Sequence, residues 1–195
     1  MEDLKKTVLE MAKRCYNEKL FSGTSGNLSA LDTKQNLIAI TPSGIPYSTM
    51  STEDIVIINL QGKLIEGLHH PSSEWPLHTA LYAGKPGITG IIHTHSTYAT
   101  ACATLRQEIP VITVEILKYI GGPIPVSKFA MNGTPEVGQH ALEAMKDSPA
   151  CLMANHGSVA VGKTLAEAYL TSVYVETAAK IFLLAQNAGT PVPLI

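Results

Sequence analysis

Three histidines and one glutamate in this sequence of 195 residues have the residue types and the spacing of a metal site. They are Glu74, the run His93-Thr94-His95, and His156 in an Asn-His-Gly turn. Side chains at positions i and i+2 of a β-strand project to one face from Cα atoms about 6.6 Å apart, so His93 and His95 can share one ion. Because alternate histidines on a surface strand often bind nothing, this pair alone is a weak signal.

His156 and Glu74 strengthen that signal. His156 lies in a tight turn between two apolar runs, where its ring can supply a third nitrogen. Glu74 stands at the start of a predicted helix and can serve as a fourth, exchangeable ligand or as a base. Zn²⁺ on three neutral histidines keeps its positive charge for polarising a bound carbonyl. The four residues together predict a catalytic site for Zn²⁺ or another divalent ion.

Three pairs of small polar residues have the character of an anion site. They are Gly26-Asn27, Ser43-Gly44 and Ser72-Ser73, and each pair can offer backbone N–H and side-chain donors without bulk. Each pair is also explained by ordinary turn or N-cap chemistry, so only their coexistence with a metal site favours a phosphorylated substrate. The sequence has no Walker-type glycine run and no GxGxxG, which disfavours nucleotide binding.

The other histidines and the cysteines are interpreted as non-ligating. His69 and His70 precede a proline in a polar loop and are expected to be solvated, and His78 and His140, in predicted helices, are given the same interpretation. Cys15, Cys102 and Cys151 are far apart and are expected to be reduced core thiols.

Composition limits the class of protein. Hydrophobic residues make up 45% of the chain, which suits a single globular domain over residues 1–195. Fourteen Lys and Arg against sixteen Asp and Glu leave a net charge of -2 without a basic cluster, which argues against nucleic acid or a basic membrane face. No signal peptide and no run of ~18 apolar residues is found, so we expect a cytoplasmic protein with small-molecule partners.

Periodicity predicts the elements that must position these residues. Apolar residues at three- and four-residue steps predict a helix over about 4–16, and caps and breakers predict helices at 74–83, 97–105, from 134, and from 164 to about 188. β-type runs predict strands at 37–41, 55–60, 88–95, 111–114, 124–126, 151–154 and 158–161. Their irregular alternation, with several closely spaced strand pairs, predicts a mixed α/β domain.

Several motifs in this order resemble the class II aldolase/adducin family over nearly the whole chain. They are Gly-Thr-Ser-Gly-Asn-Leu-Ser at 23–29, Thr-Pro-Ser-Gly at 41–44, Pro-Ser-Ser-Glu at 71–74, and the two histidine motifs. Ile45-Pro46-Tyr47 makes the resemblance greatest to the L-fuculose-1-phosphate aldolases of that family. The resemblance implies a three-layer α/β/α sandwich with a central mixed, mainly antiparallel sheet. It also implies a homotetramer with active sites between subunits.

The same resemblance implies roles for the motif residues. It places one Zn²⁺ per subunit on His93, His95 and His156, with Glu74 alternating between ligand and acid/base. It assigns the substrate phosphate to Gly26, Asn27, Ser43, Gly44, Ser72 and Ser73. The implied reaction is reversible aldol cleavage of a ketose 1-phosphate to dihydroxyacetone phosphate and an aldehyde.

Departures from the family pattern leave alternatives open. Val114 stands where the fuculose enzymes carry a tyrosine, and Tyr119, five residues on, is a candidate catalytic residue for a neighbouring subunit or an interface residue. The substrate could instead be 5-deoxyribulose or methylthioribulose 1-phosphate. A pentulose-5-phosphate 4-epimerase would carry an aspartate where Lys118 aligns, which counts against epimerisation. A methylthioribulose-phosphate dehydratase and a non-catalytic adducin-like interaction module are further alternatives, although retention of all four ligand candidates argues against the module.

Overall fold

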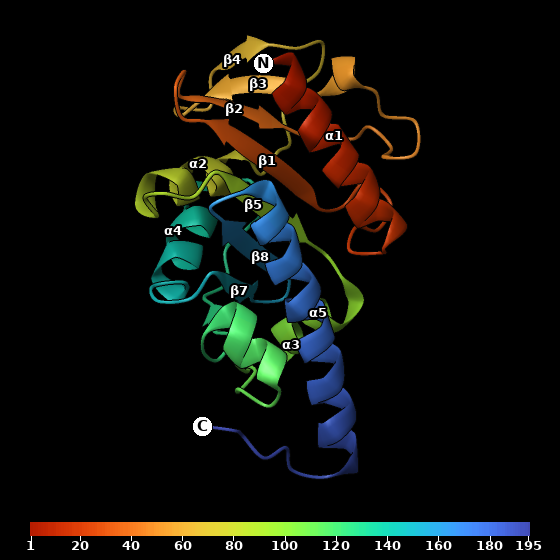
Figure 1. Ribbon diagram of the computed structural model, residues 1–195, viewed down its shortest axis with the longest axis vertical. Helices are drawn as coiled ribbons and strands as arrows, with labels where there is room; N and C mark the ends of the chain where they lie inside the picture. Colours follow the sequence, from red (N-terminus) through yellow and green to blue (C-terminus); the bar gives the residue numbers. More distant parts are fainter.

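Helices cover both faces of an eight-stranded sheet in the computed structural model, which describes residues 1–195 (Figure 1). The strand order is β4-β3-β2-β1-β5-β8-β7-β6. Neighbouring strands are antiparallel except for β6 and β7, which are parallel. The expected three-layer sandwich with a mixed, mainly antiparallel sheet is confirmed.

The secondary-structure elements have the following bounds. The strands are β1 (Asn27–Asp32), β2 (Leu37–Ile40), β3 (Val56–Asn59), β4 (Leu64–Glu66), β5 (Gly90–Thr94), β6 (Val126–Ser127), β7 (Ala150–Met153) and β8 (Gly157–Gly162). The helices are α1 (Glu2–Asn17), α2 (Trp75–Gly84), α3 (Thr97–Leu105), α4 (Pro135–Ala144) and α5 (Leu165–Ala188). A 3-10 turn, η1 (Thr52–Asp54), and a five-residue π-helix, η2 (Ile116–Ile120), complete the set.

Successive side chains of the central strands point to opposite faces of the sheet, so the hydrophobic core is divided between the two faces. In β5, Ile91 packs with apolar residues of α2 and α4, whereas the next residue, Ile92, packs with α1 and the start of α5. A third cluster lies under α3 and the C-terminal part of α5. Successive side chains of a strand point to opposite faces, so the face that holds Ile91 also receives the side chain of His93. The metal-site candidates on β5 therefore face α2.

The sequence pattern does not predict strands β1 and β4, and the strand that it predicts at 111–114 is absent from the structure. Asn27 and Ser29 place polar side chains on the core face of β1, which hides the apolar alternation. The β-prone run 111–114 has no sheet partner, because the sheet ends at β6, and the chain turns there into η2. Local β propensity alone does not form a strand without a neighbour to pair with. The predicted helix at 74–83 begins one residue later, with Glu74 as its N-cap.

Helix α5 bears on the expectation that no segment is apolar enough to span a membrane. It has 24 residues and is long and apolar enough to cross a membrane by length and composition alone. Within the fold, 44% of its most apolar stretch is buried, and the buried side chains pack on the sheet and on α3. A core helix of a globular domain meets the same criterion for this reason.

Candidate metal centre

His93 and His95 lie at the end of the central strand β5. His93 is 0% exposed, and its Nδ1 lies 2.9 Å from the carbonyl oxygen of Ser158 on β8. A carbonyl accepts only, so Nδ1 carries the hydrogen and Nε2 presents its lone pair to the centre. The Nε2 atoms of His93 and His95 are 2.9 Å apart. Strand alternation thus brings the two rings of the His-Thr-His run together.

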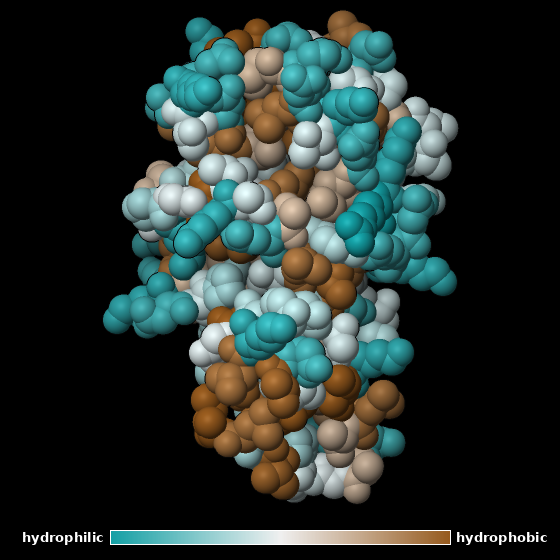
Figure 2. Space-filling view, in the orientation of Figure 1, coloured by the Kyte–Doolittle hydropathy of each residue, from teal (hydrophilic) through white to brown (hydrophobic).

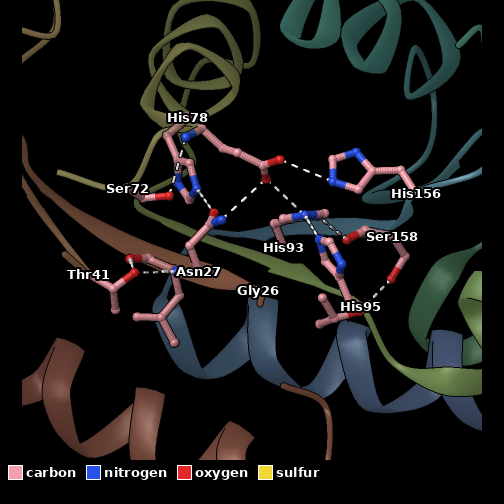
Figure 3. A network of polar contacts seen from close by, with 12 residues as sticks. Gly26, Asn27, Thr41, Ser72, His78, His93, His95, His156 and Ser158 are labelled. Atoms are coloured by element: carbon pink, nitrogen blue, oxygen red, sulfur yellow. Dashed lines mark hydrogen bonds and ion pairs between the residues drawn. The ribbon is translucent and has the colours of Figure 1, made fainter. Parts of the chain in front are cut away.

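His156 reaches the same point from the turn between β7 and β8. Asn155 adopts a left-handed conformation with φ of 57°, and the His156 N–H donates to the carbonyl of Met153 at 2.9 Å. The His156 ring centroid is 4.7 Å from the centroids of both His93 and His95. Figure 3 shows these three rings facing one another. The structure therefore brings together imidazoles that are far apart in the sequence.

Glu74 completes the cluster from the start of α2, where it is 4% exposed. Its Oε2 lies 2.8 Å from His93 Nε2 and its Oε1 lies 3.0 Å from His156 Nε2. Asn27 Nδ2 donates to Oε2 at 3.2 Å, and the Glu74 N–H donates to Ser72 Oγ at 3.3 Å. The carboxylate is therefore held from both sides at the centre.

The electrostatics of the cluster favour an ionised Glu74 carboxylate and a neutral His95 imidazole. Burial alone would raise the pKa of Glu74, but the charges and hydrogen bonds of His93 and His156 lower it well below its usual range. Burial and the two neighbouring histidines lower the pKa of His95 to about 3. Burial also acts to lower the pKa of His93, yet Glu74 outweighs it and raises that pKa. A metal requires deprotonated ligands, so Glu74 and His95 are already in the form that binds one.

The donor set fits a divalent cation. The four ligand atoms of Glu74, His93, His95 and His156 all lie within 4.8 Å of one another. Tetrahedral Zn–N bonds of ~2.0–2.1 Å imply neighbouring ligand atoms roughly 3.3 Å apart, close to the contacts of the cluster. Three imidazole nitrogens and one carboxylate oxygen suit zinc and related divalent metals.

The three pairs that are predicted to bind an anion lie on loops that are bonded to one another, and Asn27 and Ser72 of these pairs contact Glu74. The N–H of Ser43 donates to the His70 carbonyl and the N–H of Ser72 donates to the Thr41 carbonyl, both at 3.0 Å. The hydroxyl of Tyr47 donates to the Gly26 carbonyl at 2.6 Å. These bonds join the loops that carry Gly26-Asn27, Ser43-Gly44 and Ser72-Ser73. Gly44, with φ of 73°, is exposed and has no heavy atom within 4 Å of an added Cβ, so the space beside this residue is free.

Tyr119 does not join the centre of its own chain. It lies in η2, stacks on Tyr174 with ring centroids 4.1 Å apart, and lines a cavity of about 710 Å³ that contains none of the four cluster residues. Two other cavities, of about 520 and 310 Å³, border the cluster through His95. A role for Tyr119 at a neighbouring subunit stays a prediction.

The remaining histidines and cysteines are placed as follows. The prediction that His78 is solvated is wrong. Its side chain is 0% exposed, because its ring nitrogens lie 2.7 Å from Ser29 Oγ and 2.6 Å from Asn27 Oδ1 inside the fold. Its position four residues after Glu74, on the same helix face, is a signal that could have linked it to the centre. His69 is partly buried and lies 2.8 Å from Asp54 Oδ1, His70 is exposed, and His140 is partly buried. Cys15, Cys102 and Cys151 are buried and unpaired, as expected.

We expect Gly157→Ala to distort the centre and lower stability. An added Cβ would lie 2.1 Å from the Thr94 carbonyl oxygen, so β8 must move away from β5 beside His156 and His95. Strain of this kind typically costs ~1–3 kcal/mol, which urea unfolding would measure. Gly122→Ala is the control, since nothing lies within 4 Å of its added Cβ. Equal stability of the two variants would contradict the close packing.

We also expect acid to destabilise the protein through His78. Burial, with a smaller effect of His93, lowers the pKa of His78 from 6.5 to about 3. Below about pH 6.5 the unfolded chain binds a proton that the folded protein does not, so stability falls between pH 6.5 and 3 by up to ~1.4 kcal/mol per pH unit. The free energy of unfolding, measured with urea at a series of pH values from 7 to 4, should depend less steeply on pH in His78→Gln than in the unaltered protein. An unchanged slope would contradict this assignment.

Comparison with known proteins agrees with this geometry. Residues 6–183 match the family described as Class II Aldolase and Adducin N-terminal domain. A 5-deoxy-D-ribulose 1-phosphate aldolase of Bacillus thuringiensis serovar kurstaki is 34% identical over 184 residues, which are 94% of this chain and 86% of that protein. An L-ribulose-5-phosphate 4-epimerase of Salmonella paratyphi C is 33% identical over 199 residues, covering 96% and 87% of the two chains.

Solved structures show the same fold. An L-fuculose 1-phosphate aldolase superposes with a TM-score of 0.95 at 39% identity and covers 99% of this chain and 91% of its own. The L-fuculose-1-phosphate aldolase of Thermus thermophilus has a TM-score of 0.82 at 27% identity, covering 97% and 98%. The architecture described above is therefore that of solved sugar-phosphate aldolases along almost its whole length.

Proposed function

Because this chain belongs to the class II aldolase and adducin family, whose aldolases are metal-dependent lyases, we propose that it catalyses reversible aldol cleavage of a ketose 1-phosphate. The products are dihydroxyacetone phosphate and an aldehyde. The observation that carries the proposal is the convergence of His93, His95, His156 and Glu74 beside three joined, glycine- and serine-containing loops. A substrate of the L-fuculose 1-phosphate kind, or 5-deoxyribulose or methylthioribulose 1-phosphate, has the phosphate and carbonyl that such a site would bind.

In this proposal the three histidines and Glu74 hold one Zn²⁺ per subunit. The ion supplies Lewis-acid polarisation of the substrate carbonyl. Glu74 takes a proton from C3 of dihydroxyacetone phosphate in the synthetic direction and returns it during cleavage. Its burial, its contact with two imidazoles and its hydrogen bond from Asn27 hold the carboxylate where this proton is exchanged.

The phosphate is assigned to the joined loops. Gly26, Asn27, Ser43, Gly44, Ser72 and Ser73 supply backbone and side-chain donors in this proposal. Ser43, Gly44 and Ser73 are exposed, whereas Asn27 and Ser72 are buried toward Glu74. A substrate lying across these loops would have its phosphate at the exposed end and its reacting carbons at the metal.

Assembly as a homotetramer is part of the same proposal. Figure 2 shows apolar residues gathered at the end of the molecule that carries the C-terminal half of α5. Exposed apolar residues there and in the neighbouring segments include Leu105, Val114, Leu117, Leu184, Leu194 and Ile195. A second copy covering this end would bury them. Tyr119, close to Val114 in the chain, would then act at the neighbouring centre.

Epimerisation of a pentulose 5-phosphate is the second candidate, because one relative is named a 4-epimerase at 33% identity. Lys118 stands where the epimerases carry an aspartate, and it is exposed beside Tyr119. An ammonium cannot replace a carboxylate as a proton acceptor at neutral pH. This position favours cleavage over epimerisation.

The deciding experiment is a substrate panel assayed for triose phosphate. The purified protein, with its metal content measured, is given L-fuculose 1-phosphate, 5-deoxyribulose 1-phosphate, methylthioribulose 1-phosphate and L-ribulose 5-phosphate. Release of dihydroxyacetone phosphate from a ketose 1-phosphate supports the proposal. Conversion of L-ribulose 5-phosphate without triose phosphate identifies an epimerase, and dehydration of the methylthio substrate identifies a dehydratase. Absence of both metal and turnover, even with added Zn²⁺, identifies an adducin-like interaction module.

A further inference from the structure

Behind Glu74, a chain of buried polar side chains runs away from the metal centre into the fold. Asn27 bonds Glu74, and its Oδ1 lies 2.6 Å from His78 Nε2. The other ring nitrogen of His78 lies 2.7 Å from Ser29 Oγ, which lies 2.9 Å from the Tyr82 hydroxyl. Figure 3 shows the ring of His78 beside the Asn27 amide. None of the mechanism above uses His78, Ser29 or Tyr82.

The sequence positions of these residues explain their alignment. Asn27 and Ser29 are two residues apart on β1 and pair with His93 and Ile91, so both side chains point to the α2 side of the sheet. Glu74, His78 and Tyr82 are spaced four residues apart at the start of α2 and along it, which puts them on one helix face. Burying such groups is costly unless every one is hydrogen-bonded.

The direction of each hydrogen bond follows from the carboxylate. An ionised Glu74 only accepts, so Asn27 must turn its NH₂ toward Glu74 and its carbonyl oxygen toward His78. His78 must then carry its hydrogen on Nε2, which leaves Nδ1 as an acceptor. The Ser29 hydroxyl donates to Nδ1 and accepts from the Tyr82 hydroxyl at 2.9 Å, the shorter of two contacts of that hydroxyl, since the Thr89 carbonyl lies 3.4 Å from it. A flipped Asn27 would place its oxygen against the carboxylate, which is repulsive.

We propose that His78, as the Nε2–H tautomer that a hydrogen bond from Ser29 to Nδ1 supports, is a positioning residue that fixes the Asn27 amide and, through it, the carboxylate of Glu74. The proposal rests on the proposed function, in which Glu74 exchanges a proton with the substrate. Without the Ser29 donor, Nδ1 of His78 loses its hydrogen-bond partner, which weakens the preference for this tautomer and makes it easier for Asn27 to rotate away from the orientation that binds Glu74. The three histidine ligands are not part of this hydrogen-bond chain, so we expect the metal to stay bound when the chain is broken.

The tautomer is tested directly by NMR of protein labelled with ¹⁵N-histidine and loaded with Zn²⁺. We expect His78 at pH 7 to show a protonated Nε2 and an unprotonated Nδ1 in long-range ¹H–¹⁵N spectra. A protonated Nδ1 would overturn the proposal, because Asn27 could not then donate to Glu74. This measurement needs no substrate, so it stands apart from the failure of the proposed aldol reaction.

The consequence is tested by Ser29→Ala. We expect kcat to fall about 10- to 100-fold, the range typical of lost supporting hydrogen bonds, with metal content unchanged and KM little altered. The His78 signals should show the second tautomer. Ser29→Thr keeps the hydroxyl and should restore most of kcat. Ser172→Ala, which removes a buried serine hydroxyl bonded within α5, is the matched control.

Two outcomes would refute the role of Ser29. One is a kcat for Ser29→Ala equal to that of Ser172→Ala. The other is a loss of kcat that Ser29→Thr shares in full, since packing rather than the hydroxyl would then be responsible. If Ser29→Ala does not fold, the tautomer found in the unaltered protein decides the proposal.

Discussion

His95→Ala is expected to remove the metal and at least ~10³-fold of kcat/KM, which corresponds to about 4 kcal/mol of transition-state stabilisation. The side chain is partly exposed and follows the last residue of β5, so its loss breaks no hydrogen bond of the sheet. The Nε2 of His95 lies 2.9 Å from that of His93. Without His95, the site keeps two imidazole ligands and one carboxylate, which is one nitrogen ligand fewer than the proposed zinc site needs. Metal analysis and initial rates, compared with unaltered protein, measure both losses.

The control for this variant is His140→Ala, which removes a partly buried imidazole on α4, outside the cluster. It should keep full metal content. Circular dichroism and urea unfolding of His95→Ala should match the metal-free unaltered protein, because the core contacts are unchanged. A His95→Ala protein that still holds one metal per chain would show that the cluster does not bind metal as proposed.

Glu74→Gln is expected to keep the metal while turnover falls about 10²- to 10⁴-fold, the usual contribution of a general acid/base group. The three imidazoles remain, and glutamine has nearly the same shape. Its amide cannot exchange a proton at C3, and one of its two ends becomes a donor that faces either Asn27 Nδ2 or a histidine. Steady-state rates with the preferred ketose 1-phosphate, together with metal analysis, test this result.

Glu143→Gln is the matched control, since that glutamate is exposed and pairs with Lys128 on the surface. It should leave both metal content and rate unchanged. Exchange of the C3 hydrogen of dihydroxyacetone phosphate with solvent gives a second readout, because it follows proton abstraction without an aldehyde. An unimpaired rate for Glu74→Gln would refute the acid/base role.

The loops at 41–44 and 71–73 show what a local sequence pattern can predict and what it cannot. Thr41-Pro42-Ser43-Gly44 and Pro71-Ser72-Ser73 are turns by their residue types, and the sequence alone indicated donors suited to an anion. Their side-by-side placement depends on a β-bridge between Pro42 and Pro71 and on two backbone bonds across the fold. No spacing in the sequence predicts such a contact.

Strand β1 is the opposite case, because its local sequence pattern does not predict a strand although β1 lies in the middle of the sheet. Ser29 and Asn27 interrupt its apolar pattern because their side chains meet His78 and Glu74 rather than apolar neighbours. The same tertiary contact makes His78 a buried residue instead of a solvated one. Polar residues on a core face can be recognised only when their partners are known.

What the sequence determined by itself is therefore the chemistry of the ligands and the type of most elements, because residue type, strand alternation and helix capping are local properties. The tertiary structure decided which of these groups meet. His156 lies 61 residues beyond His95, and only the pairing of β8 with β5 brings their rings to 4.7 Å. It also decided that Tyr119 faces away from the centre of its own chain, because η2 packs against α5 and Tyr174. Long-range pairing, which no local pattern encodes, is the physical reason for both.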